Sequence, residues 1–239
     1  MAASLVLSDV AVRYGGVQAL HAVSLTVEPG ATLGLIGPNG AGKTTLINAT
    51  TGITPIQHGS IVLGAQRLDG LPTHRIARAG IARTYQNIRL FGALDVRTNL
   101  AAGAFARPGR LDDAGVRALL ARAGIAHVDP GARAGTLPYG DQRRLEIARA
   151  LAAQPAILML DEPAAGMNPT ETGNLVHTIR EIARTGIGVL LIEHDMALVR
   201  AACDAVVVLN FGEVLARGTP ADVARDPAVI EAYLGTGAA

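Results

Sequence analysis

The chain has 239 residues, of which 49% are hydrophobic and 17% are charged. A chain of this length and composition can bury a sizeable core, which excludes an intrinsically disordered protein. Its formal net charge is +1, so no basic excess favours a nucleic acid as the main ligand. The one cysteine, Cys203, excludes an internal disulfide and is typical of a reducing compartment.

The apolar runs are short. The three most apolar runs, 156–160, 186–192 and 205–209, fall far below the roughly 20 residues that a membrane-spanning helix needs. They are typical of buried strands. Residues 1–7 have neither the basic start nor the long apolar stretch of a signal peptide. We therefore expect a protein that is soluble, or that reaches a membrane only through a partner.

The first part of the chain predicts strands around a glycine-rich loop. Leu5–Tyr14 alternates as a half-buried strand would. The two predicted faces are Leu5, Leu7 and Asp9 on one side, and Val6, Val10 and Val12 on the other. Residues 22–27 are expected to pair with it, and Thr32–Ile36 predicts a buried strand. A helix is expected from Lys43 to about residue 51.

In the middle of the chain, between about residues 86 and 155, the strand signals vanish and helical patterns dominate. We expect a helical lobe at about 87–155, inserted in a core lobe formed by about 1–86 and 156–239. Residues 106–110, with Pro108 and Gly109, predict an exposed loop in that lobe.

The last part of the chain alternates strands and helices. Asn168, Pro169 and Glu171 are typical of the first turn of a helix, and Gly186 is typical of its end. Strands are expected at 156–160, 187–192 and 205–209, and a further helix from residue 219. This alternation predicts a mostly parallel α/β core in a single domain that spans residues 1–239.

A glycine-rich stretch joins the predicted strand Thr32–Ile36 to the helix that follows it. Its residues are Gly37, Pro38, Asn39, Gly40, Ala41, Gly42, Lys43, Thr44 and Thr45. They fit the phosphate-binding loop GxxxxGK[ST] in the strand–helix context that this pattern requires. The glycines let backbone N–H groups surround phosphates, and the helix N-terminus attracts anions. We expect Lys43 to contact the β- and γ-phosphates of ATP, and the Thr44 hydroxyl to bind Mg²⁺.

Two carboxylates follow the apolar strand predicted at 156–160. Asp161 is expected to hold Mg²⁺, directly or through water, and Glu162 to polarise the attacking water as a general base. An apolar run that ends in Asp-Glu is common by itself. Its pairing with the phosphate loop favours the functional interpretation.

In combination these motifs resemble the ATP-binding cassette (ABC) family, and the resemblance covers nearly the whole chain. Gln86 matches the family's glutamine that contacts Mg²⁺ and links to the transmembrane partner. His194 matches the histidine that senses the γ-phosphate. Tyr14 stands where family members stack an aromatic ring on adenine, and its alternative is an ordinary half-buried strand position. The resemblance thus implies catalytic roles for Lys43, Gln86, Glu162 and His194.

The family's signature motif, which contacts the ATP of a second cassette, departs from its common form here. The matching residues are Leu137, Pro138, Tyr139, Gly140 and Asp141, just before a helix expected at 141–154. The common form is Leu-Ser-Gly-Gly-Gln, so Pro138 replaces the serine and Tyr139 the first glycine. Pro138 offers neither a hydroxyl nor an N–H to a phosphate. Losing one charge-assisted hydrogen bond costs roughly 1.5–3 kcal/mol, so we expect a weaker composite site at this signature.

Within the family, the sequence is most similar to the ATPases of branched-chain amino-acid importers. The stretches that carry this similarity are 85–91, 139–149, 164–169, 192–196 and 229–235. One departure is that the helical insertion after Leu100 is shorter than in those ATPases. The alternatives are a lipid-handling or export ATPase, or a soluble ABC protein that acts on ribosomes or DNA. The single cassette, the absence of a heptad run and the near-neutral charge argue against the soluble class.

The resemblance also implies an architecture and partners. The fold would be a P-loop NTPase core, with a mostly parallel sheet and an antiparallel β subdomain, plus an inserted helical subdomain. The partners would be transmembrane permease subunits and a second ATP-binding subunit, identical or paralogous, in a head-to-tail dimer. The location would be the cytoplasmic face of the inner membrane. Leu90 and Phe91 are candidate contacts with the permease, with an ordinary place in the subdomain core as the alternative.

Overall fold

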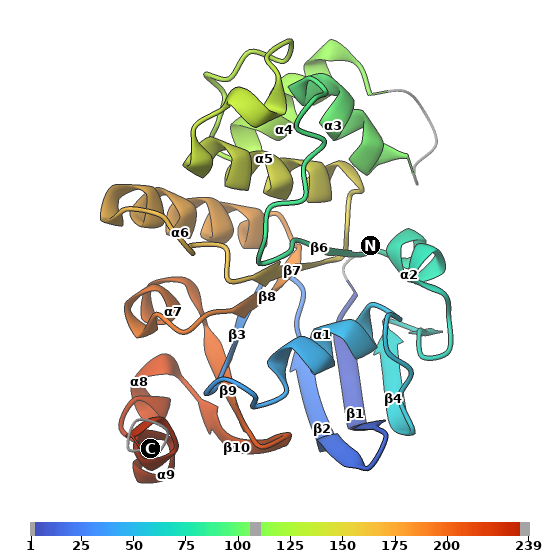
Figure 1. Cartoon of the computed structure of the whole chain (residues 1–239), viewed down its shortest axis with the longest axis vertical. Helices are drawn as coiled ribbons and strands as arrows, with labels where there is room; N and C mark the ends of the chain where they lie inside the picture. The colour runs from blue at the N-terminus through green and yellow to red at the C-terminus, as the bar shows by residue number, and fades with distance from the viewer. Residues whose placement is uncertain (1–2, 106–110, 235–239) are drawn as a thin grey trace.

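Two β-sheets and a group of helices make up the computed structural model, which describes residues 3–105 and 111–234 (Figure 1). The exposed loop expected at 106–110 lies outside the described residues. Within those residues, no helix combines the length and the apolar character that a membrane span requires.

The larger sheet has six strands in the order β10-β9-β3-β8-β7-β6, and all its pairs are parallel except β9 with β10. The strands are β3 (Thr32–Ile36), β6 (Ile81–Arg83), β7 (Ile157–Asp161), β8 (Gly188–Ile192), β9 (Ala205–Asn210) and β10 (Glu213–Gly218). Every residue of β3, β7 and β8 is buried. Parallel strands covered on both faces are apolar throughout, which explains why their sequences lack alternation.

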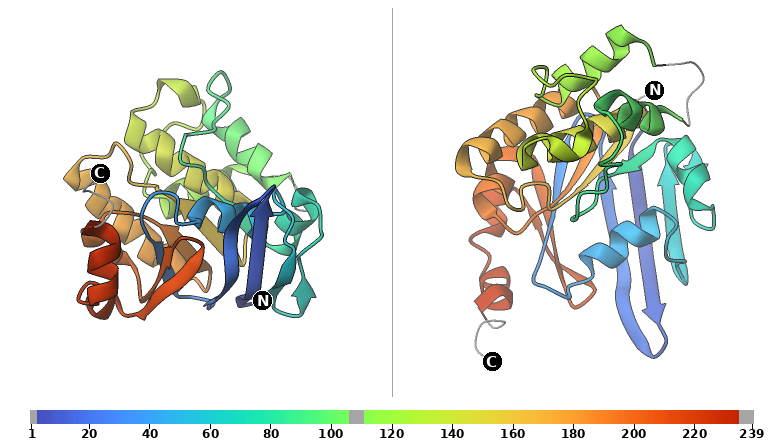
Figure 2. Two further views of the ribbon diagram at one scale, coloured as in Figure 1. Left: turned by 60° about the horizontal axis from the view of Figure 1, so that its bottom comes forward. Right: turned by 45° about the horizontal axis from the view of Figure 1, so that its top comes forward.

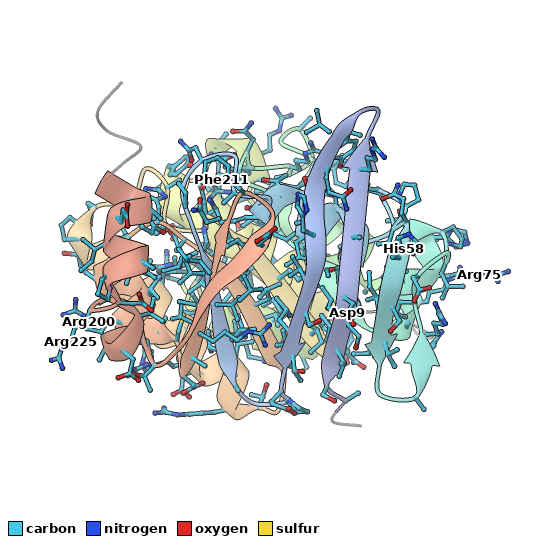
Figure 3. All side chains as sticks on the ribbon, turned by 90° about the horizontal axis from the view of Figure 1, so that it is seen from below. Asp9, His58, Arg75, Arg200, Phe211 and Arg225 are labelled. Atoms are coloured by element: carbon cyan, nitrogen blue, oxygen red, sulfur yellow. The ribbon has the colours of Figure 1, made fainter. Side chains whose placement is uncertain are left out.

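The smaller sheet is antiparallel, in the order β2-β1-β4-β5. Its strands are β1 (Leu5–Tyr14), β2 (Val17–Val27), β4 (His58–Leu63) and β5 (Gln66–Arg67). The strict alternation expected along β1 is wrong beyond Leu7. Asp9, which is labelled in Figure 3, has a φ of 50°. The pairing register of β1 with β2 shifts between Leu7 and Val10. This bulge turns Val10 to the same buried side as Leu7.

The helical group contains no named strand among the described residues of 87–155, as expected. It comprises α3 (Val96–Ala104), α4 (Asp113–Arg122), a short 3-10 helix η1 (Ala134–Thr136) and α5 (Tyr139–Ala152). Figure 1 shows this group at the top of the view, with the antiparallel strands β1, β2 and β4 at the bottom, and Figure 2 shows it from two further sides. Helix α5 begins two residues earlier than expected: Pro138 is its N-cap residue, with a φ of −52° and a ψ of 149°, and Tyr139 is its first residue.

The remaining helices cover both faces of the larger sheet. They are α1 (Lys43–Thr50), α2 (Thr73–Ala79), α6 (Pro169–Arg184), α7 (Met196–Ala202), α8 (Pro220–Val223) and α9 (Pro227–Leu234). Alternate residues of β7 divide between two cores. Leu158 and Leu160 pack with α5, α6 and α7, while Ile157 and Met159 pack with α1 and the smaller sheet. The predicted α/β architecture, with an antiparallel sheet and inserted helices, is therefore confirmed.

Candidate nucleotide site

The phosphate loop connects β3 to α1 and depends on glycine at two positions. Gly37 has a φ of 149°, and a Cβ added there would lie 2.1 Å from the carbonyl oxygen of Leu209. Gly42, directly before α1, has a φ of 105° and would place a Cβ 2.9 Å from the carbonyl oxygen of Ala19. Any side chain at Gly37 or Gly42 would collide with the backbone of β9 or β2, so the loop is tightly held from outside.

The ammonium group of Lys43 lies inside this loop. Its Nζ donates hydrogen bonds to the carbonyl oxygens of Gly37, at 2.6 Å, and Pro38, at 2.9 Å. Burial lowers the pKa of Lys43, and the nearby carboxylates of Glu162 and Asp161 oppose that shift. The amine is therefore held at the place where phosphate oxygens would enter.

Two pockets adjoin the loop. The first, which we name the phosphate pocket, has a volume of about 580 Å³. Its lining comprises Val17, Gln18, Ala19, His21, Asn39 to Thr45, Gln86, Asp161, Glu162, Ile192 and Phe211. The second, the histidine pocket, has a volume of about 630 Å³. Its lining comprises Gly37, Pro38, Asn39, Gln86, Glu162, His194 and Tyr233. The predicted loop, glutamine, carboxylates and histidine thus meet around the two pockets.

Asp161 ends β7 at the floor of the phosphate pocket, and its carboxylate already has a cationic partner. Arg83 Nη2 lies 3.4 Å from Asp161 Oδ2, and both side chains are largely buried. Burial raises the pKa of Asp161, and the Arg83 guanidinium opposes that shift. Arg83 also donates from Nη1 to Asn48 Oδ1 at 2.8 Å, which ties β6 to α1. The sequence contained no motif that pointed to Arg83.

The oxygen donors of the phosphate pocket fit a magnesium ion. Thr44, Gln86 and Asp161 line this pocket with a hydroxyl, an amide and a carboxylate. Across the part of the chain that the structure describes, no three His, Cys, Asp or Glu side chains gather as metal ligands. Mg²⁺ typically uses one or two protein carboxylates and completes its shell with water and substrate phosphates. The hydroxyl, amide and carboxylate oxygens of this pocket are consistent with that coordination of Mg²⁺.

Glu162 lies where both pockets meet. Its backbone has a φ of 46°, an unfavourable conformation that the bond from its N–H to Ile192 O helps to hold. Gln86 Nε2 donates to Glu162 Oε2 at 2.8 Å, and His194 Nδ1 lies 4.0 Å from Oε1. Neighbouring Glu193, which sequence reasoning missed, is buried and accepts a hydrogen bond from Ala164 N. The carboxylate of Glu162 is therefore flanked by an amide and an imidazole.

The predicted adenine platform lies outside the lining of both pockets. Tyr14 is 49% exposed, and its hydroxyl is 3.0 Å from Thr54 Oγ1. The phosphate pocket instead includes Phe211, which is 79% exposed at the turn between β9 and β10 (Figure 3). Sequence reasoning missed Phe211 because an isolated aromatic in a turn carries no motif.

The signature residues, Leu137 to Asp141, also lie outside the lining of both pockets. They run from the end of η1 into the first turn of α5, where a Cβ on Gly140 would lie 2.7 Å from Glu171 Oε1. Asp141 Oδ2 is 3.1 Å from His127 Nε2. The structure thus gathers the phosphate loop, Gln86, Asp161, Glu162 and His194, and leaves the signature on a different part of the surface.

Comparisons with known proteins agree with this geometry. Residues 20–165 match the family described as ABC transporter, and residues 213–239 match one described as branched-chain amino acid ATP-binding cassette transporter. The high-affinity branched-chain amino acid transport ATP-binding protein BraF of Pseudomonas aeruginosa is 43% identical over 97% of each chain. LivG of Escherichia coli, with the same description, is also 43% identical over 97% of each chain. LptB of Escherichia coli, a lipopolysaccharide export system ATP-binding protein, is 36% identical over 98% of each chain.

Solved structures give the same result. An ATP-binding cassette of an ABC transporter in its ADP conformation matches with a TM-score of 0.87 and 28% identity. The match covers 98% of this chain and 100% of that one. A nucleotide-free cassette matches equally well, with a TM-score of 0.87 over 97% of this chain and 98% of that one. The chain therefore belongs to the ABC transporter family, as an ATP-hydrolysing cassette.

Proposed function

We propose that this cassette is the motor subunit of a membrane importer for branched-chain amino acids or similar small amphipathic solutes. The observation that carries the proposal is the meeting of Lys43, Gln86, Glu162 and His194 around one phosphate loop. The substrate class rests on the 43% identity to BraF and LivG over nearly the full chains. The identity to LptB is lower, 36%, which supports import over the alternative of a lipid-handling or export system. Co-purification with a solute-binding protein would distinguish import from export.

In this proposal each group around the loop has one task. Lys43 leaves the carbonyl oxygens of Gly37 and Pro38 and binds the β- and γ-phosphates. Mg²⁺, held by Thr44, Gln86 and Asp161, would neutralise phosphate charge. Glu162 accepts a hydrogen bond from the attacking water and orients it toward the γ-phosphate, while His194 contacts the γ-phosphate.

The position of the signature supports a head-to-tail dimer. Leu137 to Asp141 line neither pocket of their own chain, so they are free to close over the ATP of a second cassette. The second cassette would be identical or paralogous. We propose that nucleotide binding brings the core lobe (about 1–86 and 156–239) and the helical lobe (about 87–155) of each chain toward the partner.

A third pocket, between α2, β6, α3 and α5, suits the docking of a permease. It has a volume of about 360 Å³, and its lining includes Tyr85, Phe91 and Gly103. Phe91 is 52% exposed, whereas Leu90 packs partly against the core. Phe91 is thus the better of the two candidates for an apolar permease contact. Such docking would hold the cassette on the cytoplasmic face of the inner membrane.

The test is the mass in solution of a Glu162→Gln variant, measured by light scattering with and without MgATP. The substitution removes the proposed base and keeps its shape, so ATP should bind and remain unhydrolysed. We expect a shift from monomer to dimer upon addition of MgATP. A Lys43→Ala variant is the matched control, since it should neither bind ATP nor dimerise. A Glu162→Gln chain that binds ATP but stays monomeric would contradict the homodimer, and one that does not bind ATP would contradict the function.

A further inference from the structure

Tyr139 stands at the first glycine of the usual signature, and in this chain it makes contacts that a glycine cannot make. Its ring lies against Gly166, in the loop that follows Glu162. A Cβ added to Gly166 would be 3.1 Å from Tyr139 Cε1. The Tyr139 hydroxyl accepts a hydrogen bond at 3.1 Å from Nη2 of Arg143, which lies one helical turn further along α5. The side chain is thus fixed at both ends even though Tyr139 is 46% exposed.

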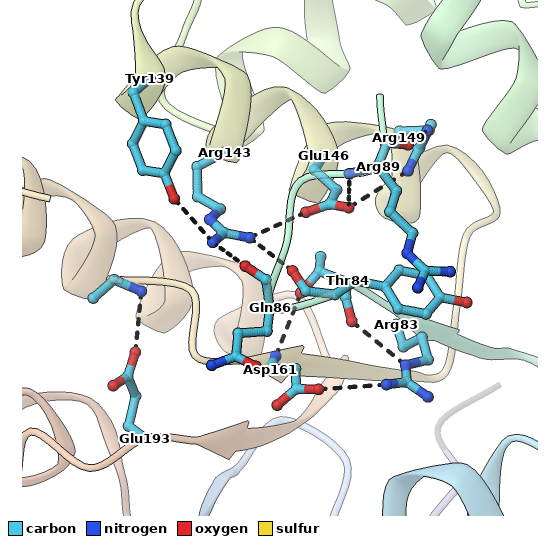
Figure 4. Close-up of polar contacts among 12 residues, drawn as sticks. Arg83, Thr84, Gln86, Arg89, Tyr139, Arg143, Glu146, Arg149, Asp161 and Glu193 are labelled. Atoms are coloured by element: carbon cyan, nitrogen blue, oxygen red, sulfur yellow. Dashed lines mark hydrogen bonds and ion pairs between the residues drawn. The ribbon is translucent and has the colours of Figure 1, made fainter. Parts of the chain in front are cut away.

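Arg143 connects this tyrosine to the segment that carries Gln86. The residue is 1% exposed, and its guanidinium spans the gap between α5 and the segment after β6 (Figure 4). Nη1 donates to Tyr85 O at 2.7 Å, and Nη2 donates to Gln86 O as well as to Tyr139. Glu146 Oε2 lies 3.5 Å from Nη1 and supplies a buried counter-charge. A buried guanidinium has five rigidly placed donors, so it holds these oxygens in a fixed arrangement.

Gln86 is therefore held at two points. Arg143 binds its backbone carbonyl, and its side-chain amide donates to Glu162 Oε2 at 2.8 Å. Figure 4 shows the hydrogen bonds that join the Tyr139 hydroxyl to Arg143 and Arg143 to the Gln86 carbonyl. The bond from the Gln86 amide to Glu162 continues this series to the carboxylate. All of these groups belong to one chain. Movement of the start of α5 would shift the Gln86 backbone and so the amide that faces Glu162.

We propose that Tyr139 and Arg143 are positioning residues for the Glu162 of their own chain. In this arrangement the signature end of α5 acts on two sites, the ATP of the partner cassette and, through Arg143 and Gln86, its own water-activating carboxylate. The inference rests on the proposed role of Glu162 as the base. The usual glycine at position 139 of the signature has no side-chain hydroxyl, so it could not bind Arg143 as Tyr139 does.

Hydrogen exchange in the isolated chain tests the structural half of this proposal. The segment 84–91 reports on it because the amide of Arg89 is bonded to Glu146 Oε1 and so exchanges slowly. Tyr139→Phe keeps the ring and removes the hydroxyl. Arg143→Lys keeps the positive charge and removes the planar guanidinium group that binds several oxygens at once. We expect exchange in this segment to become about tenfold faster in each variant, the factor for one lost hydrogen bond to a charged group.

Arg144→Lys is the matched control. Arg144 is the next residue of α5 and is also buried, but it donates to Gly124 O and Glu171 O. Its substitution should speed exchange near those residues and leave 84–91 unchanged. This measurement needs no turnover, so its failure is distinct from a failure of the proposed function. Unchanged exchange at 84–91 in both Tyr139→Phe and Arg143→Lys would overturn the inference.

Steady-state kinetics test the catalytic half. Since the phosphate loop is untouched, Tyr139→Phe and Arg143→Lys should each lower kcat for ATP about tenfold while KM stays within about twofold. The double variant should lose no more than the larger single loss, because both residues act through one connection. The inference would be overturned if the kcat losses of the two single variants multiplied in the double variant. It would also be overturned if the single variants had the same kcat as the unsubstituted chain.

Discussion

Lys43 is the only lysine in the chain, since the other 20 of its 21 basic residues are arginine. Its ammonium group is enclosed by the carbonyl oxygens of Gly37 and Pro38. Burial lowers its pKa, so at any pH near neutrality a larger fraction is neutral amine than for an exposed lysine. Only the neutral amine reacts with acylating reagents. The residue therefore offers a chemical probe of the phosphate loop.

We predict that the half-maximal rate of Lys43 acylation falls at a lower pH than for N-acetyl-lysine amide. MgATP should slow the reaction at least about tenfold by occupying the loop, as expected for a tightly held ligand. Mass spectrometry of the peptide that contains residue 43 measures both effects, and Lys43→Arg gives the background. Labelling that MgATP does not slow would contradict a phosphate role for this amine.

At the scale of single residues, motifs revealed only part of the site. Lys43, Thr44, Asp161 and Glu162 were predictable because each belongs to a short stretch with fixed spacing and chemical logic. Arg83 and Arg143 were not, although both are buried and bind site residues. Their partners are 78 and 57 residues away along the chain, and only the pairing of β6 with β7 and the packing of α5 bring them together.

Among the elements, α6 was the most predictable. Asn168 Oδ1 accepts from Glu171 N at 3.0 Å, and Glu171 Oε2 accepts from Asn168 N at 2.9 Å, which completes a capping box. All of these signals lie within four residues, so no tertiary contact is needed to recognise them. Strand β6 was missed because its formation depends on a tertiary contact and not on a local sequence signal. It has only three residues and exists because β7 pairs with it at the sheet edge.

Substitution of Asn168 by alanine should lower the free energy of unfolding by about 1 kcal/mol, because one N-terminal amide of α6 loses its acceptor. Urea denaturation measures the change, and the slope of the transition should stay constant. Thr170→Ala, in the exposed first turn of the same helix, is the control and should change stability by less than about 0.5 kcal/mol. Equal effects of the two substitutions would show that the capping box does not stabilise α6.

At the scale of the whole molecule, the two halves of an ATP site lie on separate surfaces of one chain. The phosphate loop, Gln86, Glu162 and His194 surround two adjoining pockets. Pro138 is exposed at the start of α5 and lines neither of them. A lesion in the phosphate loop and a lesion in the signature of one chain would then damage different sites of a head-to-tail dimer. This separation predicts complementation between two inactive variants.

Lys43→Ala removes the ammonium group from the phosphate loop, which binds the chain's own ATP. Pro138→Glu places a carboxylate in the signature, where it would repel the ATP of the partner chain. Each variant alone should be inactive. In a mixed dimer, the phosphate loop of the Pro138→Glu chain meets the intact signature of the Lys43→Ala chain, so one composite site survives. Mixing equal amounts should restore at most about half of unsubstituted turnover, since each mixed dimer keeps one of its two sites. Phosphate release measures the recovery, and a Lys43→Ala, Pro138→Glu double variant mixed with Lys43→Ala should recover nothing. No recovery in the first mixture would mean that the signature serves its own chain or requires a different partner.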